Sequence, residues 1–165
     1  MGQIEKKQAT NLMEAVHSGV GLAGWHGGMA DSFRTNNMYQ FMVGGQFVCH
    51  PGGFVDYKVN IIKNNDPITA NINDFQLRSE QYYMHVDPNN EVLVTTTFEG
   101  HHPISFKGEN TYECSWVKNF VMPVVWKKMW GKGRVFYCSI GHDLDALHIP
   151  EVNTMIKRGM LWASL

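Results

Sequence analysis

The stretch GVGLAGWHGGMADSFR, Gly19–Arg34, decides the fold. It opens as an apolar run, turns polar after His26 and carries glycines on both sides of that histidine. Val20–Trp25 therefore predicts a short buried strand, and Gly27 and Gly28 permit a sharp turn after it. A strand that turns abruptly at one reactive side chain flanked by small residues has the geometry of a nucleophile elbow. We expect His26 at the carboxyl end of this strand, where open α/β sheets bind ligands.

Helices and strands alternate along the rest of the chain. Stretches rich in β-branched residues predict strands at 55–62, 91–98, 121–130 and 134–141, the last two joined by the tight turn GKG. Apolar residues at helical spacing predict helices at 4–19, 31–44 and 149–165, with Asp31 as the N-cap of the second. This alternation predicts a doubly wound α/β fold with a mainly parallel sheet and helices on both faces. We expect residues 1–165 to form a single domain.

Composition excludes several classes of protein. The chain has 165 residues, of which 44% are hydrophobic and 18% charged, so it is globular and not disordered. Its net charge of −1 gives no electrostatic attraction to nucleic acid or to an anionic membrane. No apolar run approaches the roughly 18–20 residues of a membrane span, and the first residues lack the apolar core of a signal peptide. Three widely spaced cysteines without a CxxC pair indicate a reduced, cytoplasmic protein and no zinc-thiolate site.

A second histidine repeats the pattern of the first. In GRVFYCSIGHD, a buried strand and Gly141 lead to His142, so two histidines at strand ends could converge on one crevice. Glu80, in RSEQYY, lies among aromatic residues near a strand end and can orient a histidine, bind a metal or act as a base. We predict His26, Glu80 and His142 as the catalytic residues. The same three are candidate ligands of a divalent metal such as zinc, and a metal-free acid/base site remains equally open.

Five further residues are predicted to bind the substrate. Asp31 and Arg34 follow the elbow by about one helical turn and would line its mouth. Tyr82 and Trp126 are expected to form aromatic walls, and His50 lies on a loop because Pro51 extends the residue before it. The alternative is structural: His26 would pack in the core, and Asp31 would only cap a helix.

Several segments, taken in order, cover nearly the whole chain and form a specific set. They are GVGLAGWHGGMADSFR, YQFMVGGQFVCHPGG, DPITANINDFQLRSEQYY, MPVVWKKMWGKGRVFYCSIGHD and IKRGMLWA. Together they resemble the ThuA-like family, which is named for trehalose utilisation. The resemblance implies the class I glutamine amidotransferase-like fold, which is flavodoxin-like in its layers.

The resemblance also bears on the chemistry. In the amidotransferase fold a cysteine occupies the elbow, and a histidine with a glutamate follows the last strands. Here His26 occupies the elbow segment and His142 takes the place of that histidine, while neither Cys49 nor Cys138 replaces the missing thiol. The resemblance therefore implies no glutaminase activity and a sugar ligand, trehalose or a related keto sugar. Two classes stay open: a sugar-active enzyme, and a non-catalytic binding or scaffold protein that retains the fold.

The family's domain usually begins with β-α units before the helix at 4–19. We therefore expect the domain to be partial at its N-terminus, with apolar surface beside Ile4–Val16 that a second copy of the chain could cover. The expected partners are a small sugar and a homo-oligomer, without nucleic acid or membrane.

Overall fold

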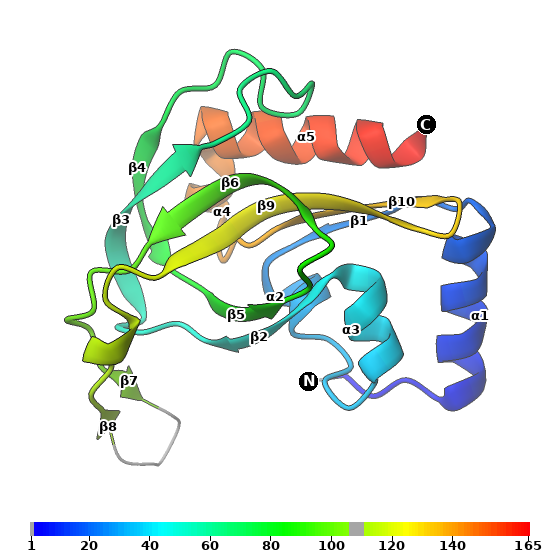
Figure 1. Ribbon diagram of the computed structural model, residues 1–165, viewed down its shortest axis with the longest axis horizontal. Helices are drawn as coiled ribbons and strands as arrows, with labels where there is room; N and C mark the ends of the chain where they lie inside the picture. Colours follow the sequence, from blue (N-terminus) through cyan, green and yellow to red (C-terminus); the bar gives the residue numbers. More distant parts are fainter. Residues whose placement is uncertain (1, 106–110) are drawn as a thin grey trace.

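The computed structural model describes residues 2–105 and 111–165 and consists of helices packed on a central sheet (Figure 1). The helices are α1 (Lys6–Ser18), α2 (His26–Ala30), α3 (Asn37–Val43), α4 (Leu144–His148) and α5 (Pro150–Ser164), with a 3-10 turn, η1, at Ser115–Val117. The strands are β1 (Leu22–Trp25), β2 (Gly45–Cys49), β3 (Phe54–Ile61), β4 (Phe75–Glu80), β5 (Tyr83–Val86), β6 (Glu91–Thr97), β7 (Ile104–Ser105), β8 (Thr111–Tyr112), β9 (Val121–Trp130) and β10 (Gly133–Cys138).

Within the described part of the chain, six strands form the central sheet, in the order β1-β10-β9-β6-β3-β4. Helix α5 covers one face, and α1, α2 and α3 lie on the other with the small β2–β5 sheet (Figure 1). The predicted α/β class, with helices on both faces, is thus confirmed. The strand directions correct the expectation of a mainly parallel sheet: among the described residues β1 and β10 pair in parallel, and the other neighbours of this sheet are antiparallel.

The antiparallel pairing has a local cause. Gly131 and Lys132 form a two-residue turn between β9 and β10, and such a turn can only reverse the chain. Parallel neighbours need a longer crossover, which the chain between β1 and β10 supplies. The sheet is therefore mixed because most of its strands follow one another through turns and loops instead of helices.

The predicted helix at 31–44 is wrong in its first half. Helix α3 begins only after Asn36, whose side chain accepts a hydrogen bond of 3.0 Å from the Tyr39 amide, and Asp31 instead follows the end of α2. Phe33 interrupts the helix with φ of 50°, a conformation that a helix cannot contain. The predicted end at Gly44 is confirmed, because this glycine adopts the left-handed conformation.

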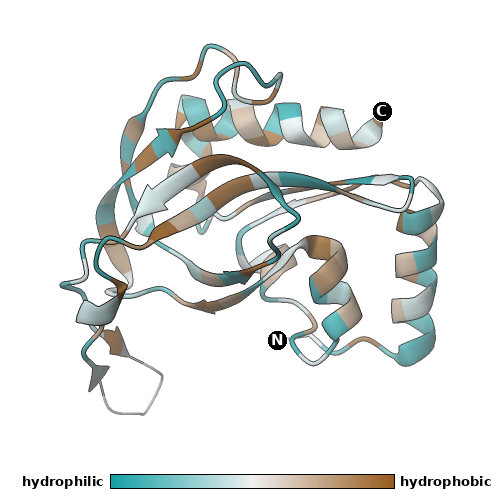
Figure 2. Ribbon diagram, viewed as in Figure 1, coloured by the Kyte–Doolittle hydropathy of each residue, from teal (hydrophilic) through white to brown (hydrophobic). Residues whose placement is uncertain are grey.

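Two apolar cores flank the sheet, and adjacent residues of β10 alternate between them. Phe136 packs toward α5, while Val135 and Tyr137 pack toward α1 and α3. Helix α5 approaches so closely that a Cβ at Gly159 would lie 2.3 Å from the Phe136 ring. Apolar residues recur along β9 where it crosses between the two cores (Figure 2). On α1, Val16 is buried while other apolar residues of the helix, Leu12 and Met13, stay partly exposed.

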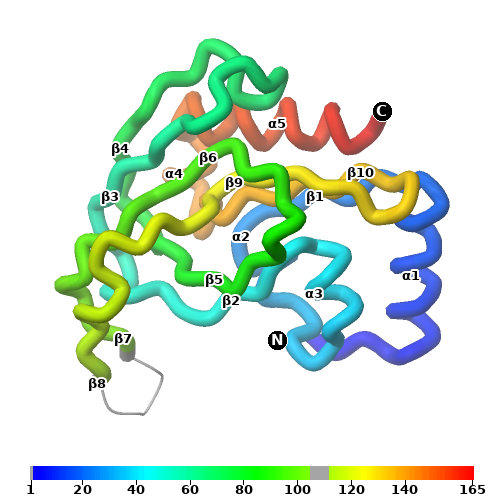
Figure 3. The backbone as a smooth tube through the Cα atoms, in the orientation of Figure 1, coloured from blue at the N-terminus to red at the C-terminus, as the bar shows by residue number. Residues whose placement is uncertain are grey.

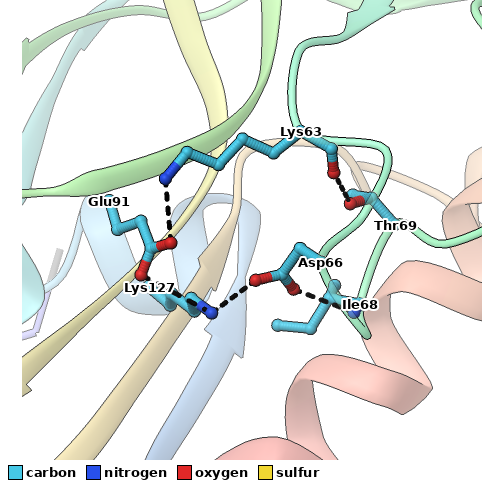
Figure 4. Close-up of polar contacts among 6 residues, drawn as sticks. All are labelled: Lys63, Asp66, Ile68, Thr69, Glu91 and Lys127. Carbon is cyan, nitrogen blue, oxygen red and sulfur yellow. Dashed lines mark hydrogen bonds and ion pairs between the residues drawn. The ribbon is translucent and has the colours of Figure 1, made fainter.

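A buried ion pair holds the long loop between β3 and β4 against the sheet (Figure 4). Lys127 of β9 pairs with Asp66 of this loop and lies 3.5 Å from Glu91 of β6. Asp66 also accepts a 2.9 Å hydrogen bond from the Ile68 amide, while Lys63 lies 2.9 Å from Glu91. Because Asp66 and Lys127 are both largely shielded from water, this pair fixes the loop more firmly than an exposed pair would.

Within residues 2–105 and 111–165, none of the helices has the length and apolar character needed to cross a bilayer. The three cysteines are free and buried. Burial raises the pKa of the Cys138 thiol to about 12 and that of the Cys49 thiol to about 11, so neither is a ready thiolate nucleophile.

Candidate functional site

The predicted catalytic residues come from three strand ends. Strands β1 and β10 are parallel and pair Trp25 with Cys138, so His26 and His142 follow them at the same end of the sheet. Glu80 ends β4, the opposite edge strand of the same sheet. The sheet is curled, so that its β4 edge approaches the end of β1 at the opposite edge (Figure 3). The three residues therefore meet although β4 is not a neighbour of β1 or β10 in the sheet.

The chain turns at His26 as the elbow prediction required. Trp25 ends the strand in extended conformation, and His26 begins α2 with φ of 51°. This left-handed conformation costs a non-glycine residue roughly 1–2 kcal/mol, so the surrounding structure must impose it. A Cβ at Gly27 would lie 3.3 Å from the Tyr82 hydroxyl, and the missing side chain thus leaves room for that hydroxyl beside His26.

The glycine before His142 is required for a different reason. Gly141 has φ of 131°, and a Cβ there would lie 2.6 Å from Cδ1 of Trp25. The backbone therefore turns tightly against the end of β1 before His142.

Glu80 is the centre of the cluster. One carboxylate oxygen, Oε2, lies 3.1 Å from Nε2 of His26 and 3.1 Å from Nδ1 of His142. The other, Oε1, lies 3.6 Å from Nε2 of His50. The Glu80 side chain is 11% exposed, whereas His142 and His50 are 40% and 38% exposed and give the cluster its opening to solvent.

His26 is held as a neutral imidazole. Burial lowers its pKa to about 4, outweighing the nearby Glu80 carboxylate, which acts in the opposite direction. Its Nδ1 lies 2.9 Å from the hydroxyl of Tyr82, whose own pKa burial raises well above the usual range, so the phenol keeps its proton. Although Nε2 is close to Glu80, its geometry is not that of a hydrogen bond, and this buried nitrogen has no hydrogen-bond partner among the described residues.

The donor set fits a divalent cation. His26, Glu80 and His142 each offer one ligand atom, and these atoms lie within 4.8 Å of one another. Two imidazoles with one carboxylate is a ligand set used for zinc and for other divalent metals. A cation between them would also give the unpartnered Nε2 of His26 a partner. Without a cation, the same groups can accept and donate protons.

The predicted substrate-binding residues fall into two groups. Arg34 pairs with Asp31 and lies over the Phe47 ring, 5.3 Å from its centroid. That ring packs 4.3 Å from Tyr82 and 5.8 Å from His50, so Asp31, Arg34 and His50 do lie beside the cluster.

Both of the predicted aromatic walls need correction. Trp126 is 0% exposed and donates a 2.9 Å hydrogen bond from Nε1 to the Val43 carbonyl, so it belongs to the core and the prediction is wrong. Tyr82 does lie in the cluster, with its ring centroid 4.4 Å from that of His26 and its hydroxyl turned to that imidazole. Because the Tyr82 side chain is buried, it offers no open face on which a sugar could stack.

The sequence reasoning missed Phe54, an exposed aromatic residue at the opening. Its ring centroid lies 5.0 Å from that of His142 in an edge-on arrangement, and Phe54 pairs with Glu80 across β3 and β4. A signal was present, because Phe54 directly follows the pair Gly52 and Gly53, which His50 precedes by two positions. A glycine pair beside a candidate site indicates a turn that brings the next side chain close.

Comparison with known proteins agrees with this architecture. The family model described as "ThuA: Trehalose utilisation" matches residues 2–163. No curated protein matches the chain at significant similarity. Among solved structures, a ThuA-like protein from Parabacteroides merdae aligns with a TM-score of 0.74 at 16% identity, covering 99% of this chain and 67% of that one. A ThuA-like protein from Bacteroides uniformis aligns with a TM-score of 0.73 at 19% identity, covering 96% of this chain and 64% of that one. The cytoplasmic protein STM1381 from Salmonella typhimurium aligns with a TM-score of 0.56 at 13% identity, covering 95% of this chain and 58% of that one.

These structural likenesses concern the fold, and the chain spans about two thirds of the length of the two ThuA-like structures. The family model spans nearly every residue from α1 to α5, including all three residues of the Glu80 cluster. The chain belongs to the ThuA family, the family described by trehalose utilisation.

Proposed function

We propose that this chain is a sugar-active ThuA protein whose centre is a divalent metal site formed by His26, Glu80 and His142. The observation that carries the proposal is the convergence of these three side chains from separate strand ends, with ligand atoms within 4.8 Å of one another. The family description supports a carbohydrate, trehalose or a related keto sugar, as the substrate. A bound cation would polarise a hydroxyl or carbonyl oxygen of that sugar.

The protein's own groups would prepare the site for this cation. Burial keeps His26 neutral and its Nε2 lone pair available, because the pKa of its imidazole is lowered to about 4. In that tautomer Nδ1 would donate a hydrogen bond to the hydroxyl oxygen of Tyr82, 2.9 Å away, and this contact would fix the orientation of the ring. His142, at the exposed side of the cluster, completes the set next to the entering substrate.

His50 is suited to proton transfer. It lies on a loop, is 38% exposed and faces the oxygen of Glu80 that does not contact His26 or His142. An imidazole placed there can take a proton from a sugar hydroxyl or return one to it. Asp31 and Arg34, which lie beside Phe47, would hold further hydroxyl groups of the sugar.

The proposal excludes glutamine hydrolysis by the amidotransferase mechanism. The amidotransferase mechanism requires a cysteine at the elbow. In this chain the elbow residue is His26, which has φ of 51°. The buried Cys138 lies inside the end of β10 and its pKa is raised to about 12, so it does not supply a thiolate.

The metal site is tested first, with zinc alone as the probe. Chelator-stripped protein should bind one equivalent of Zn²⁺ in a competition titration, with X-ray fluorescence identifying the metal retained after purification. Glu80→Gln and His142→Asn should each weaken the affinity by roughly 100-fold or more. His85→Asn, an exposed histidine on β5, is the matched control and should leave it unchanged. Stoichiometric binding that survives both cluster substitutions would reject this site.

Catalysis is tested separately. Metal-loaded wild-type protein is incubated with trehalose and with a keto derivative of trehalose, and the sugars are followed by proton NMR. Conversion by the wild type that is lost in Glu80→Gln supports the enzyme. Binding of metal and sugar without conversion would favour the second reading, a non-catalytic carbohydrate-binding protein.

A further inference from the structure

A polar groove leads away from the Glu80 cluster along the outer face of β3 and β4. Two adjoining hollows of about 520 and 600 Å³ share this face, within the range of roughly 300–1,000 Å³ typical of small-molecule sites. The floor is formed by Phe54, Asp56, Lys58, Gln76 and Arg78.

The strand register connects this groove to the cluster. Phe54 pairs with Glu80, and two residues further along β3 Asp56 pairs with Arg78. Paired residues of antiparallel strands and their neighbours two positions away point to the same face. The Asp56–Arg78 pair therefore follows the Phe54–Glu80 pair on one face, about 7 Å along the strands. Residues on the opposite face, such as Val55 and Leu77, are buried in the core with α5.

A loop closes one side of the groove. Glu99, His101 and His102 line both hollows, and the Gly52 amide donates a 2.9 Å hydrogen bond to the Pro103 carbonyl. A Cβ at Gly52 would lie 2.7 Å from Cβ of His102, so the loop is packed directly against the segment that leads to Phe54. The floor and this wall together form a channel whose end meets the opening of the cluster at Phe54 and His142.

The chemistry of the groove suits a neutral, hydroxyl-rich ligand. The larger hollow is lined by two acidic residues, Asp56 and Glu99, and two basic residues, Lys58 and Arg78, so their charges cancel. Asp56 and Arg78 form an exposed ion pair at 3.0 Å, which presents both donors and acceptors. Phe54, at 38% exposure, is an aromatic surface at the end of the groove next to His142, where the apolar face of a sugar ring can pack.

We propose that this groove binds a second sugar unit, so that the substrate is a disaccharide or larger glycoside whose reacting unit lies at the Glu80 cluster. The inference rests on the proposed function, because it places the first unit at the metal site. The second unit would lie over Phe54 and contact Asp56 and Arg78 through its hydroxyl groups.

The test compares trehalose, with two glucose units, and glucose, with one. Binding of each is measured by isothermal titration calorimetry on metal-loaded protein. Wild type should bind trehalose at least tenfold more tightly than glucose. The double variant Asp56→Ala/Arg78→Ala, which preserves the net charge, should lose this preference and keep its affinity for glucose within about twofold. Lys157→Ala, an exposed residue on α5 at the other face of the sheet, is the control and should behave as wild type.

The outcomes separate the groove from the cluster. If the double variant keeps the full preference for trehalose, the groove proposal is overturned while the metal site stands. If the wild type binds zinc but prefers neither sugar, the groove is rejected as a subsite for glucose units. If zinc binding itself fails, the proposed function fails first, and that titration does not depend on Asp56 or Arg78.

Discussion

The hydroxyl of Tyr82 lies 2.9 Å from Nδ1 of His26, and this contact orients the imidazole whose other nitrogen faces Glu80. Tyr82→Phe keeps the ring packed against Phe47 and removes only the hydroxyl. Loss of such an orienting partner commonly lowers metal affinity 10- to 100-fold, and we expect zinc affinity to fall within about that range. Chelator competition measures the change. Tyr39→Phe, which deletes another buried hydroxyl bonded to the Met29 carbonyl, should leave zinc affinity unaltered; equal losses in both variants would contradict the role of Tyr82.

The lowered pKa of His26 makes the stability of the metal-free protein depend on pH. The imidazole titrates near 6.5 in the unfolded chain and at about 4 when folded, so between these values the unfolded state binds more protons. The free energy of unfolding should therefore fall as the pH drops from about 6.5 to about 4.

Urea unfolding across this pH window tests the linkage in His26→Asn. Asparagine tolerates the left-handed backbone at this position better than alanine does, which keeps the turn intact. The variant should show a flatter dependence of stability on pH than the wild type, while His85→Asn should retain the wild-type slope. If the unfolding free energy of His26→Asn depends on pH as steeply as that of the wild type, the loss of stability in acid comes from other groups.

The sequence pattern predicted the elements with strong local signals and missed those that depend on distant partners. The strand at 121–130 and the helix at 149–165 agree with β9 and α5 to within one residue at each end. Strand β2 was missed because its partner β5 lies some forty residues further along the chain, and nothing in its few residues alternates clearly. The antiparallel pairing of β9 and β10 could have been deduced, since the GKG turn is too short for a crossover.

Part of the candidate site was also predicted from strong local signals in the sequence. Glycines beside His26 and His142 mark turns at strand ends, and the two histidines were expected to share a crevice. Glu80 was predicted to join them from its place among aromatic residues near a strand end. The contact itself depends on the curl of the whole sheet, which brings edge strand β4 to β1 and β10 and which no local pattern encodes. Trp126 was misplaced because an aromatic residue on a strand looks the same in sequence whether it faces a cleft or the core.

Trp126→Phe should lower stability without affecting ligand binding. The substitution leaves the buried carbonyl of Val43 without its donor, which costs about 1–3 kcal/mol of unfolding free energy, with a further loss from the smaller ring. Trehalose affinity should match the wild type. Trp116→Phe, at an exposed position, should change the stability by no more than about 0.5 kcal/mol. A loss of trehalose affinity in folded Trp126→Phe protein would restore Trp126 to the site.

Lys127 and Asp66 offer a test of how the loop between β3 and β4 is held. Lys127→Met keeps packing volume beside Trp162, whose ring lies 5.4 Å from the ammonium nitrogen, but it leaves the Asp66 carboxylate buried without its cation. Breaking a buried pair in this way costs about 3–5 kcal/mol, measurable by urea unfolding. Lys63→Met removes an exposed cation from the same group of charges and should cost less than about 1 kcal/mol.

The double variant Asp66→Asn/Lys127→Met shows whether the loss comes from the stranded charge. Asparagine retains an oxygen that can accept the hydrogen bond from the Ile68 amide, but it carries no charge to be buried. The double variant should therefore be more stable than Lys127→Met alone, although it carries one more substitution. If the two changes instead add, the destabilisation by Lys127→Met does not come from a stranded Asp66 carboxylate, and the ion pair does not determine the position of the loop.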